Sequence, residues 1–160
     1  MEVHDLEGVL SEHPFLADLK PEHIKLIAGC ASNRRLDAGE YVAREGDQAD
    51  EFYLIREGQL ALDIFAPQIG ARRMFTVHEG EVAGWSWLVE PHVWKFDAQA
   101  VTPVRMIAVD GKCLRGKCEL DFELGYRLFQ RVARLIEGRL TATRLQLLDL
   151  YQKEGVDARS

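Results

Sequence analysis

Glycines divide residues 34–109 into short runs of strand-forming residues, and this spacing restricts the possible fold more than any other feature. The six glycines are Gly39, Gly46, Gly58, Gly70, Gly80 and Gly84. Runs rich in aromatic and aliphatic residues lie between them, such as residues 51–55 and 59–65. Short strands separated by turn residues are typical of antiparallel rolls, barrels and sandwiches. We therefore predict an antiparallel roll, barrel or sandwich over residues 34–109.

Helical patterns flank this β segment on both sides. Residues 6–33 are predicted to form short helices interrupted at Pro14 and Pro21. Residues 110–153 are predicted to form a short helix capped by Asp110 and then a long helix. The prediction is one mainly β domain over residues 1–160, with a helical lead-in before the β segment and helices after it.

The long C-terminal helix is predicted to run from about residue 121 to 151, which corresponds to roughly 45 Å. Along it, seven residues recur at spacings of three or four, which is a heptad-like pattern. They are Phe129, Val132, Ile136, Leu140, Thr143, Leu147 and Leu150. One face of a small β-roll does not easily cover so long a helix, so we predict a homodimer through this seam. The alternative is a helix buried against its own β unit.

Charge and hydrophobicity exclude several classes of protein. The chain has 20 basic and 26 acidic residues, a net charge of −6, which is unfavourable for binding nucleic acid. Hydrophobic residues make up 47%, enough for a core, but no apolar run approaches the ~20 residues that span a bilayer. The acidic N-terminus does not resemble a signal peptide. We expect a cytoplasmic protein without membrane association or direct DNA binding.

Cysteine and histidine are sparse. Three cysteines, Cys30, Cys113 and Cys118, favour a reducing compartment over a disulfide scaffold, and Cys113 is expected to face the core. A thiol redox sensor is kept as an alternative. The five histidines include no His-x-His pair of the kind a cupin-type metal enzyme uses. No nucleotide-loop or hydrolase motif is present, so we predict no catalytic and no metal-binding residues.

The glycine pattern resembles a known family. The segments LDAGEYV (36–42), EGD (45–47) and FYLIREGQL (52–60) resemble the cyclic-nucleotide-binding domain, and more narrowly the effector domain of Crp/Fnr-type bacterial regulators. The resemblance implies a helical lead-in, a double-stranded β-roll of eight strands over residues 34–109, jelly-roll or cupin-like, then a short helix and a long dimerising helix. In such regulators a helix-turn-helix domain follows the long helix, whereas this sequence ends in a short polar tail. A stand-alone effector domain that signals through an unknown protein partner is therefore expected.

The resemblance places the ligand site in a phosphate-binding cassette, aligned with residues 80–100. In the family, a Gly-Glu pair holds the ribose and a following Arg holds the phosphate. Here Gly84 matches the glycine, Trp85 replaces the Glu, and Trp94 or Lys95 replaces the Arg. Losing each contact costs on the order of 1–3 kcal/mol. Cyclic nucleotide is therefore disfavoured as a ligand, and no cofactor is predicted.

The residues of this degenerate cassette are the candidate ligand-binding residues. They are Gly84, Trp85, Ser86, Trp87, Trp94, Lys95, Phe96 and Asp97. Either the three tryptophans fill the pocket, or they line a site for a different small effector. The predicted function is a non-enzymatic regulatory domain that senses a non-classical small ligand or acts through a protein partner. A ligand-free dimeric interaction module and a true cyclic-nucleotide binder are the alternatives.

Overall fold

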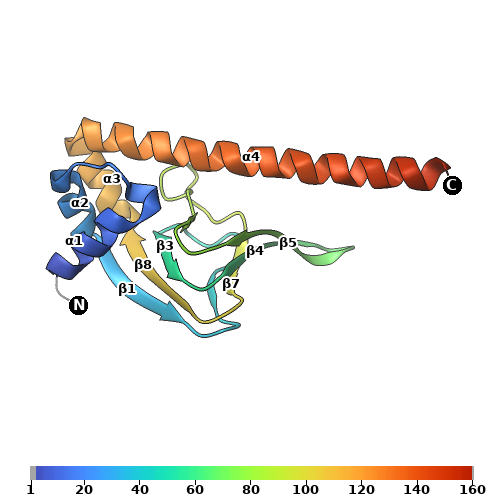
Figure 1. The fold of residues 1–160 in the computed structure, drawn as a ribbon, viewed down its shortest axis with the longest axis horizontal. Helices are drawn as coiled ribbons and strands as arrows, with labels where there is room; N and C mark the ends of the chain where they lie inside the picture. The colour runs from blue at the N-terminus through green and yellow to red at the C-terminus, as the bar shows by residue number, and fades with distance from the viewer. Residues whose placement is uncertain (1–2, 160) are drawn as a thin grey trace.

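The computed structural model describes residues 3–159, as two antiparallel sheets with helices at one end (Figure 1). The helices are α1 (Val3–Glu12), η1 (Pro14–Leu16), α2 (Pro21–Ala28), α3 (Gly111–Leu120) and α4 (Phe122–Arg159). The strands are β1 (Ala31–Leu36), β2 (Tyr41–Ala43), β3 (Glu51–Glu57), β4 (Leu60–Ala66), β5 (Gly70–Val77), β6 (Val82–Ala83), β7 (Asp97–Ala100) and β8 (Val104–Asp110). The predicted fold class is confirmed.

The two sheets have four strands each and interleave in sequence. One sheet has the order β1-β8-β3-β6 and the other the order β2-β7-β4-β5. Turn glycines join the strands as expected: Gly39, Gly46 and Gly58 have φ of 91°, 93° and 94°, a region that glycine enters without strain. No described helix is both long enough and apolar enough to cross a membrane.

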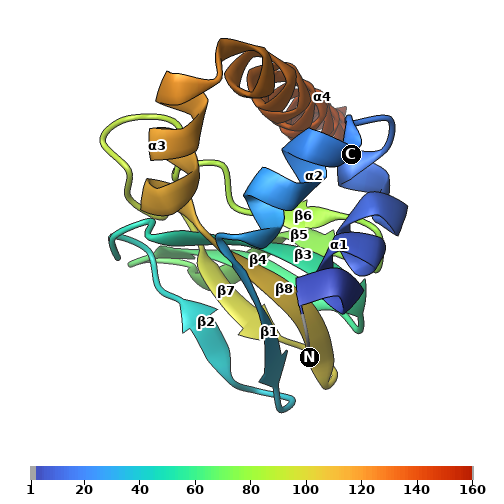
Figure 2. The same ribbon diagram turned by 90° about the vertical axis from the view of Figure 1, so that its left-hand side faces the viewer.

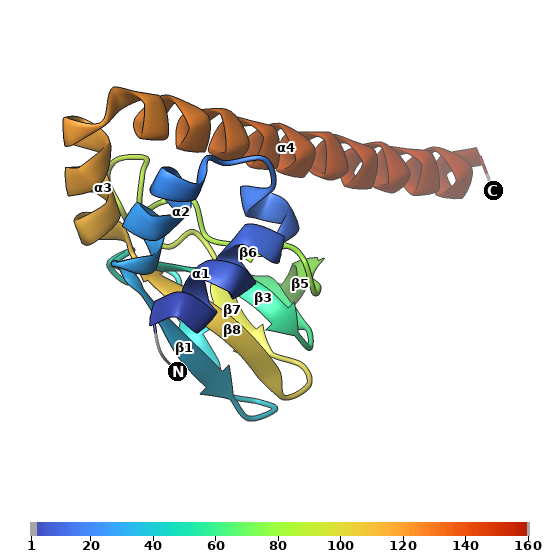
Figure 3. The ribbon, with the colours of Figure 1, turned by 60° about the vertical axis from the view of Figure 1, so that its left-hand side comes forward.

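The molecule has two cores, one on each face of the β1-β8-β3-β6 sheet. Between the sheets, Ile55, Leu60 and Met106 are at most 1% exposed. On the other face, α1, α2, α3 and the start of α4 cover Phe52 and Leu54 (Figures 2 and 3). The alternation of side chains along β3 explains this, because successive residues of a strand point to opposite faces.

Helix α4 leaves the helix-covered core after a few turns, contacts β5 through Arg139 and Gln146, and then projects past the sheets to the C-terminus (Figure 1). Leu124, Leu128 and Val132 anchor it, with exposures of 0%, 0% and 2%. The assignment of Val132 to a dimer seam is therefore wrong, because its side chain is buried in its own subunit. By contrast, Phe129 and Leu140 are 53% and 51% exposed.

Helix α3 lies beside α2, and a disulfide joins them: Cys30 follows α2 and Cys113 lies in the first turn of α3. Their Cα atoms are 5.8 Å apart although 83 positions separate them in sequence. The sequence favoured a reducing compartment over a disulfide scaffold and did not predict this pair, which forms because β8 returns the chain to the end of α2. Cys118 is the remaining free and buried cysteine.

Candidate functional site

The cassette is the connection between β6 and β7, and it begins at Gly84. Gly84 has φ of 98°, and a Cβ atom built there would lie 3.0 Å from Trp94 Cη2. Glycine is therefore required twice, by the backbone conformation and by the indole that packs over it. This close approach brings the two ends of the cassette together.

The three tryptophans lie in three different environments. Trp87 is 1% exposed and stacks on Phe52 in the helix-covered core, with ring centroids 4.6 Å apart. Trp94 is 5% exposed and stacks on Tyr53 between the sheets. Trp85 is half-buried and meets Phe96 edge-on at 6.1 Å. Their proximity in sequence therefore does not make one aromatic cluster.

Six of the eight candidate ligand-binding residues line a common space, and that space is very small. They are Gly84, Trp85, Ser86, Trp94, Lys95 and Phe96, joined by Leu62. The cavity measures about 10 Å³, at the lower limit of the room that one water molecule needs. The indole and phenyl rings thus fill the position where the family resemblance places a ligand.

The other two candidate residues point elsewhere. Trp87 faces the helices, and its carbonyl oxygen accepts a hydrogen bond from Arg115 of α3. Asp97 Oδ1 accepts a hydrogen bond of 2.8 Å from the backbone N–H of Glu45 and lies 3.4 Å from Arg44 Nε. Asp97 therefore stabilises the β2 side of the roll, and Trp87 ties the cassette to α3.

A chain of ring contacts, which the sequence did not reveal, leads from the cassette to α4. Trp85 contacts Phe96, Phe96 meets Phe75 of β5 edge-on at 5.8 Å, and Arg139 of α4 lies 4.6 Å from the centroid of Phe75. Burial lowers the pKa of Arg139, while the charge of Glu81 opposes that shift. The half-buried Arg139 guanidinium, held over the Phe75 ring, gives α4 a direct contact with the β4–β5 hairpin.

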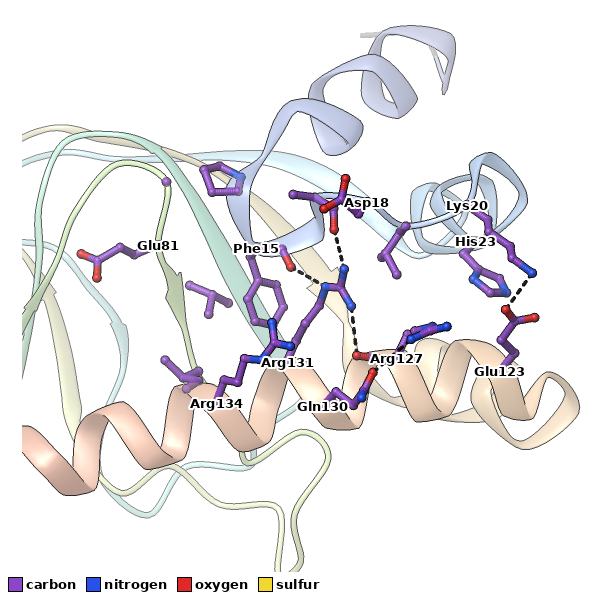
Figure 4. Close-up of a pocket in the computed structure, with 16 residues that line it drawn as sticks. Phe15, Asp18, Lys20, His23, Glu81, Glu123, Arg127, Gln130, Arg131 and Arg134 are labelled. Atoms are coloured by element: carbon purple, nitrogen blue, oxygen red, sulfur yellow. Dashed lines mark hydrogen bonds and ion pairs between the residues drawn. The ribbon is translucent and has the colours of Figure 1, made fainter.

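A second concave site lies between the lead-in and α4, as a groove of about 640 Å³ (Figure 4). Arg131 crosses it and donates hydrogen bonds to the carbonyl oxygens of Phe15 and Ala17, at 2.9 Å for Phe15. Burial lowers the pKa of Arg131, and the charges of Arg134 and Arg127 lower it further. Arg131 thus anchors the turn after η1 to α4.

The remaining charges of the groove are unevenly paired. Lys20 and Glu123 form an ion pair of 2.7 Å, and the Glu81 carboxylate accepts a hydrogen bond from the His78 N–H. Within residues 3–159, the exposed guanidinium groups of Arg127 and Arg134 make no ion pair. The groove therefore presents two guanidinium groups that no ion pair occupies (Figure 4).

Comparison with known proteins gives consistent matches. The family model of the cyclic nucleotide-binding domain matches residues 33–121. A Geobacter metallireducens protein, described as a cyclic nucleotide-binding protein, superposes with TM-score 0.74 at 27% identity, over 88% of this chain and 98% of that chain. The Thermus thermophilus catabolite activator protein, at 23% identity, superposes with TM-score 0.68 over 86% of this chain and 63% of its own, which establishes similarity of fold.

Curated relatives match over shorter segments. The cAMP-dependent protein kinase regulatory subunit of Emericella nidulans is 42% identical over 53 residues, which is 33% of this chain and 13% of that protein. The cGMP-dependent protein kinase egl-4 of Caenorhabditis briggsae is 30% identical over 78 residues, which is 49% of this chain and 10% of that protein. The matched region is thus one module within much longer proteins.

Proposed function

This chain belongs to the cyclic nucleotide-binding domain family, and from that premise we propose that it is a non-enzymatic regulatory module whose cassette is occupied by its own aromatic side chains. Its output, in this proposal, passes through α4 to a second copy and to a protein partner. The observation that carries the proposal is the cavity of about 10 Å³ beside Trp85 and Trp94.

The free-energy cost of opening the cassette supports this proposal. Moving an indole into water exposes about 200 Å² and costs about 5 kcal/mol. A ligand with a micromolar Kd gains about 8 kcal/mol on binding. If it had to displace Trp94, the cost of about 5 kcal/mol would raise its Kd by roughly three to four orders of magnitude. The cassette also lacks the carboxylate and guanidinium that the family uses. Cyclic nucleotides should therefore bind very weakly.

Calorimetric titration with cyclic AMP and cyclic GMP tests the closed cassette. We expect neither nucleotide to bind with a Kd below about 1 mM. A Trp94→Ala variant should in addition gain a cavity that accepts indole, so indole should raise its Tm and leave that of the wild type unchanged. Micromolar binding of either nucleotide to the wild type would overturn the proposal.

The second part of the proposal concerns the exposed face of α4. Because Val132 is buried and Ala133 is exposed, we replace Val132 by Ala133 in the proposed seam. Exposed residues near the start of α4 extend the seam in that direction. The proposed seam is Phe122, Tyr126, Phe129, Ala133, Ile136, Leu140, Thr143, Leu147 and Leu150. These residues keep alternating spacings of four and three throughout, which is the heptad pattern of a two-helix coiled coil.

Light scattering at micromolar concentration tests the seam. We expect a dimer for the wild type and a monomer for the variant with Leu140→Lys and Leu147→Lys, because two buried lysines would face each other across the axis. Leu145→Lys is the matched control, since Leu145 is 62% exposed but lies on another face of α4. A monomeric wild type, or an equal effect of the control, would contradict the seam.

A second candidate function is the sensing of an anionic effector in the groove of Figure 4, favoured by Arg127 and Arg134, which make no ion pair within residues 3–159. Pyrophosphate serves as the probe, because guanidinium groups bind phosphate through paired hydrogen bonds. It should raise the Tm of the wild type and of Arg144→Gln, a helix variant outside the groove. The double variant Arg127→Gln, Arg134→Gln should not respond. Equal shifts in all three proteins would exclude this function.

A further inference from the structure

The disulfide between Cys30 and Cys113 is a feature that the proposed function does not use. We propose that these two cysteines form a redox-modification site, which exchanges electrons with a low-molecular-weight thiol–disulfide couple of the glutathione class. The chemistry of this site stands apart from the proposed function, while its effect on α4, argued below, rests on that function.

The surroundings of Cys113 are those of a reactive thiol. Cys113 lies in the first turn of α3, where the helix dipole stabilises a thiolate. Lys117, one turn further along α3, brings its ammonium group to the end of α2, where it donates a hydrogen bond of 2.7 Å to the Leu26 carbonyl. The Asp110 carboxylate caps the Cys113 N–H and is the opposing negative charge.

Accessibility distinguishes the two sulfur atoms. Cys113 is half-buried, whereas Cys30 is 9% exposed and belongs to the helix-covered core. A small thiolate can therefore approach Cys113 more readily than Cys30. This assigns Cys113 as the residue that meets the external co-reactant, and Cys30 as the resolving cysteine.

The exchange balances in two steps. In oxidation, the Cys113 thiolate attacks an external disulfide, forms a mixed disulfide and releases one external thiolate. The Cys30 thiolate then attacks the Cys113 sulfur, forms the internal disulfide and releases the second external thiolate. Two electrons pass from the protein dithiol to the external disulfide, and two protons leave the protein thiols. Reduction follows the same steps in reverse.

The third cysteine does not compete in this exchange. Cys118 is buried, and burial, followed by the charges of Asp121 and Glu119, raises its pKa to about 11. Its thiol therefore remains protonated at neutral pH and is a poor nucleophile. Cys118 is for this reason the matched control position.

The position of the pair gives its redox state a structural consequence. The disulfide is the covalent tie between the end of α2 and α3, and α3 leads through Asp121 directly into α4. After reduction, α3 is held by the hydrogen bonds from the Gly111 N–H to the Asp50 carbonyl, from Arg115 to the Trp87 carbonyl and from Lys117. We expect the α3–α4 corner to become more mobile in the reduced protein.

Thiol counting in glutathione buffers tests the site. The folded wild type is equilibrated with oxidised or reduced glutathione, quenched with acid, denatured and alkylated. Its mass then gives the number of alkylated cysteines. We expect one alkylated cysteine after oxidation and three after reduction, reversibly, and the Cys118→Ser control should cycle between none and two. Three free thiols in the oxidising buffer would overturn the proposal. A disulfide that reduced glutathione cannot reduce in the folded protein would also overturn it, as would a disulfide that thioredoxin reduces but glutathione does not.

Single variants test the roles of the two sulfurs. Cys30→Ser should accumulate a glutathione adduct on Cys113, because the resolving thiol is gone, whereas Cys113→Ser should form little adduct on Cys30. The opposite distribution would overturn the assignment. Thiol counts do not depend on whether the protein dimerises or binds a partner. A failure of the proposed function would therefore leave this result intact, and the reverse also holds.

Discussion

Gly84 and Trp94 together determine the state of the cassette at the level of single residues. A glycine at φ of 98° permits the close approach of the Trp94 ring, and that ring occupies the space between the sheets. The sequence identified the glycine, and it offered a pocket filled by tryptophans as one of two alternatives. It did not indicate that Trp87 and Trp94 face different cores, because the path of the loop decides this.

Gly84→Ala separates backbone strain from the Trp94 contact when it is compared with Gly46→Ala. Both glycines have similar positive φ, 98° and 93°, but nothing lies within 4 Å of a Cβ at Gly46. We expect Gly46→Ala to lower the free energy of unfolding by about 1 kcal/mol and Gly84→Ala by about 2–4 kcal/mol. Urea denaturation measures both, and equal losses would contradict the packing of Trp94 on Gly84.

His13 should make stability depend on pH. Its Nε2–H donates to the Ile55 carbonyl at 3.1 Å, and its Nδ1 accepts the Phe15 N–H at 3.2 Å, so the neutral ring fits the site. Burial lowers the pKa of His13 below the ordinary value of 6.5, against the opposing effect of the Ile55 carbonyl. The unfolded chain therefore binds a proton first as the pH falls.

The expected result is a free energy of unfolding that is constant above about pH 6.5 with respect to this group and falls from there toward the lowered folded pKa. Denaturation of the wild type and His13→Gln between about pH 5 and 7.5 measures the difference. The slope of the wild type should exceed that of the variant. Identical slopes would show that the ring is not held neutral.

Individual elements differ in how far the sequence predicts them. The glycine spacing predicts short antiparallel strands, the family resemblance selects the β-roll, and apolar residues at spacings of three and four predict α4 as a long amphipathic helix. The pattern does not determine which face of α4 meets its own core, because Val132 and Ala133 differ by about 100° around the helix. The Cys30–Cys113 pair was missed for a similar reason, since only the return of β8 to α2 brings these residues together.

The contact between the β4–β5 hairpin and α4 is testable with a matched pair of phenylalanines. Phe75 lies between Phe96 and Arg139, whereas Phe65 of the same hairpin is 58% exposed. We expect Phe75→Ala to lower the free energy of unfolding by about 2–3 kcal/mol, and Phe65→Ala to change it by less than about 0.5 kcal/mol. Similar values for the two variants would show that Phe75 does not link the cassette to α4.

For the whole molecule, pairing through α4 should make thermal stability depend on protein concentration. Association that occurs only in the folded state stabilises that state by mass action. The Tm of the wild type should therefore rise with concentration, while that of the variant with Leu140→Lys and Leu147→Lys should stay constant. Calorimetric scans over a hundredfold range of concentration measure this. A constant wild-type Tm would speak against the pair.

The projection of α4 beyond the sheets gives the molecule a mechanical property. The helix has 38 residues, which corresponds to a rod of about 57 Å. Its base is buried in the body, and its contacts with β5 extend as far as Gln146, whose side-chain amide donates a hydrogen bond of 2.9 Å to the Met74 carbonyl oxygen. By simple leverage, a rotation of about 5° at the α3–α4 corner, with the β4–β5 hairpin following the helix, would displace the far end by about 5 Å, close to one helical turn. Rearrangements at the base that are too small to alter the core could thus produce a displacement that a partner at the tip would detect.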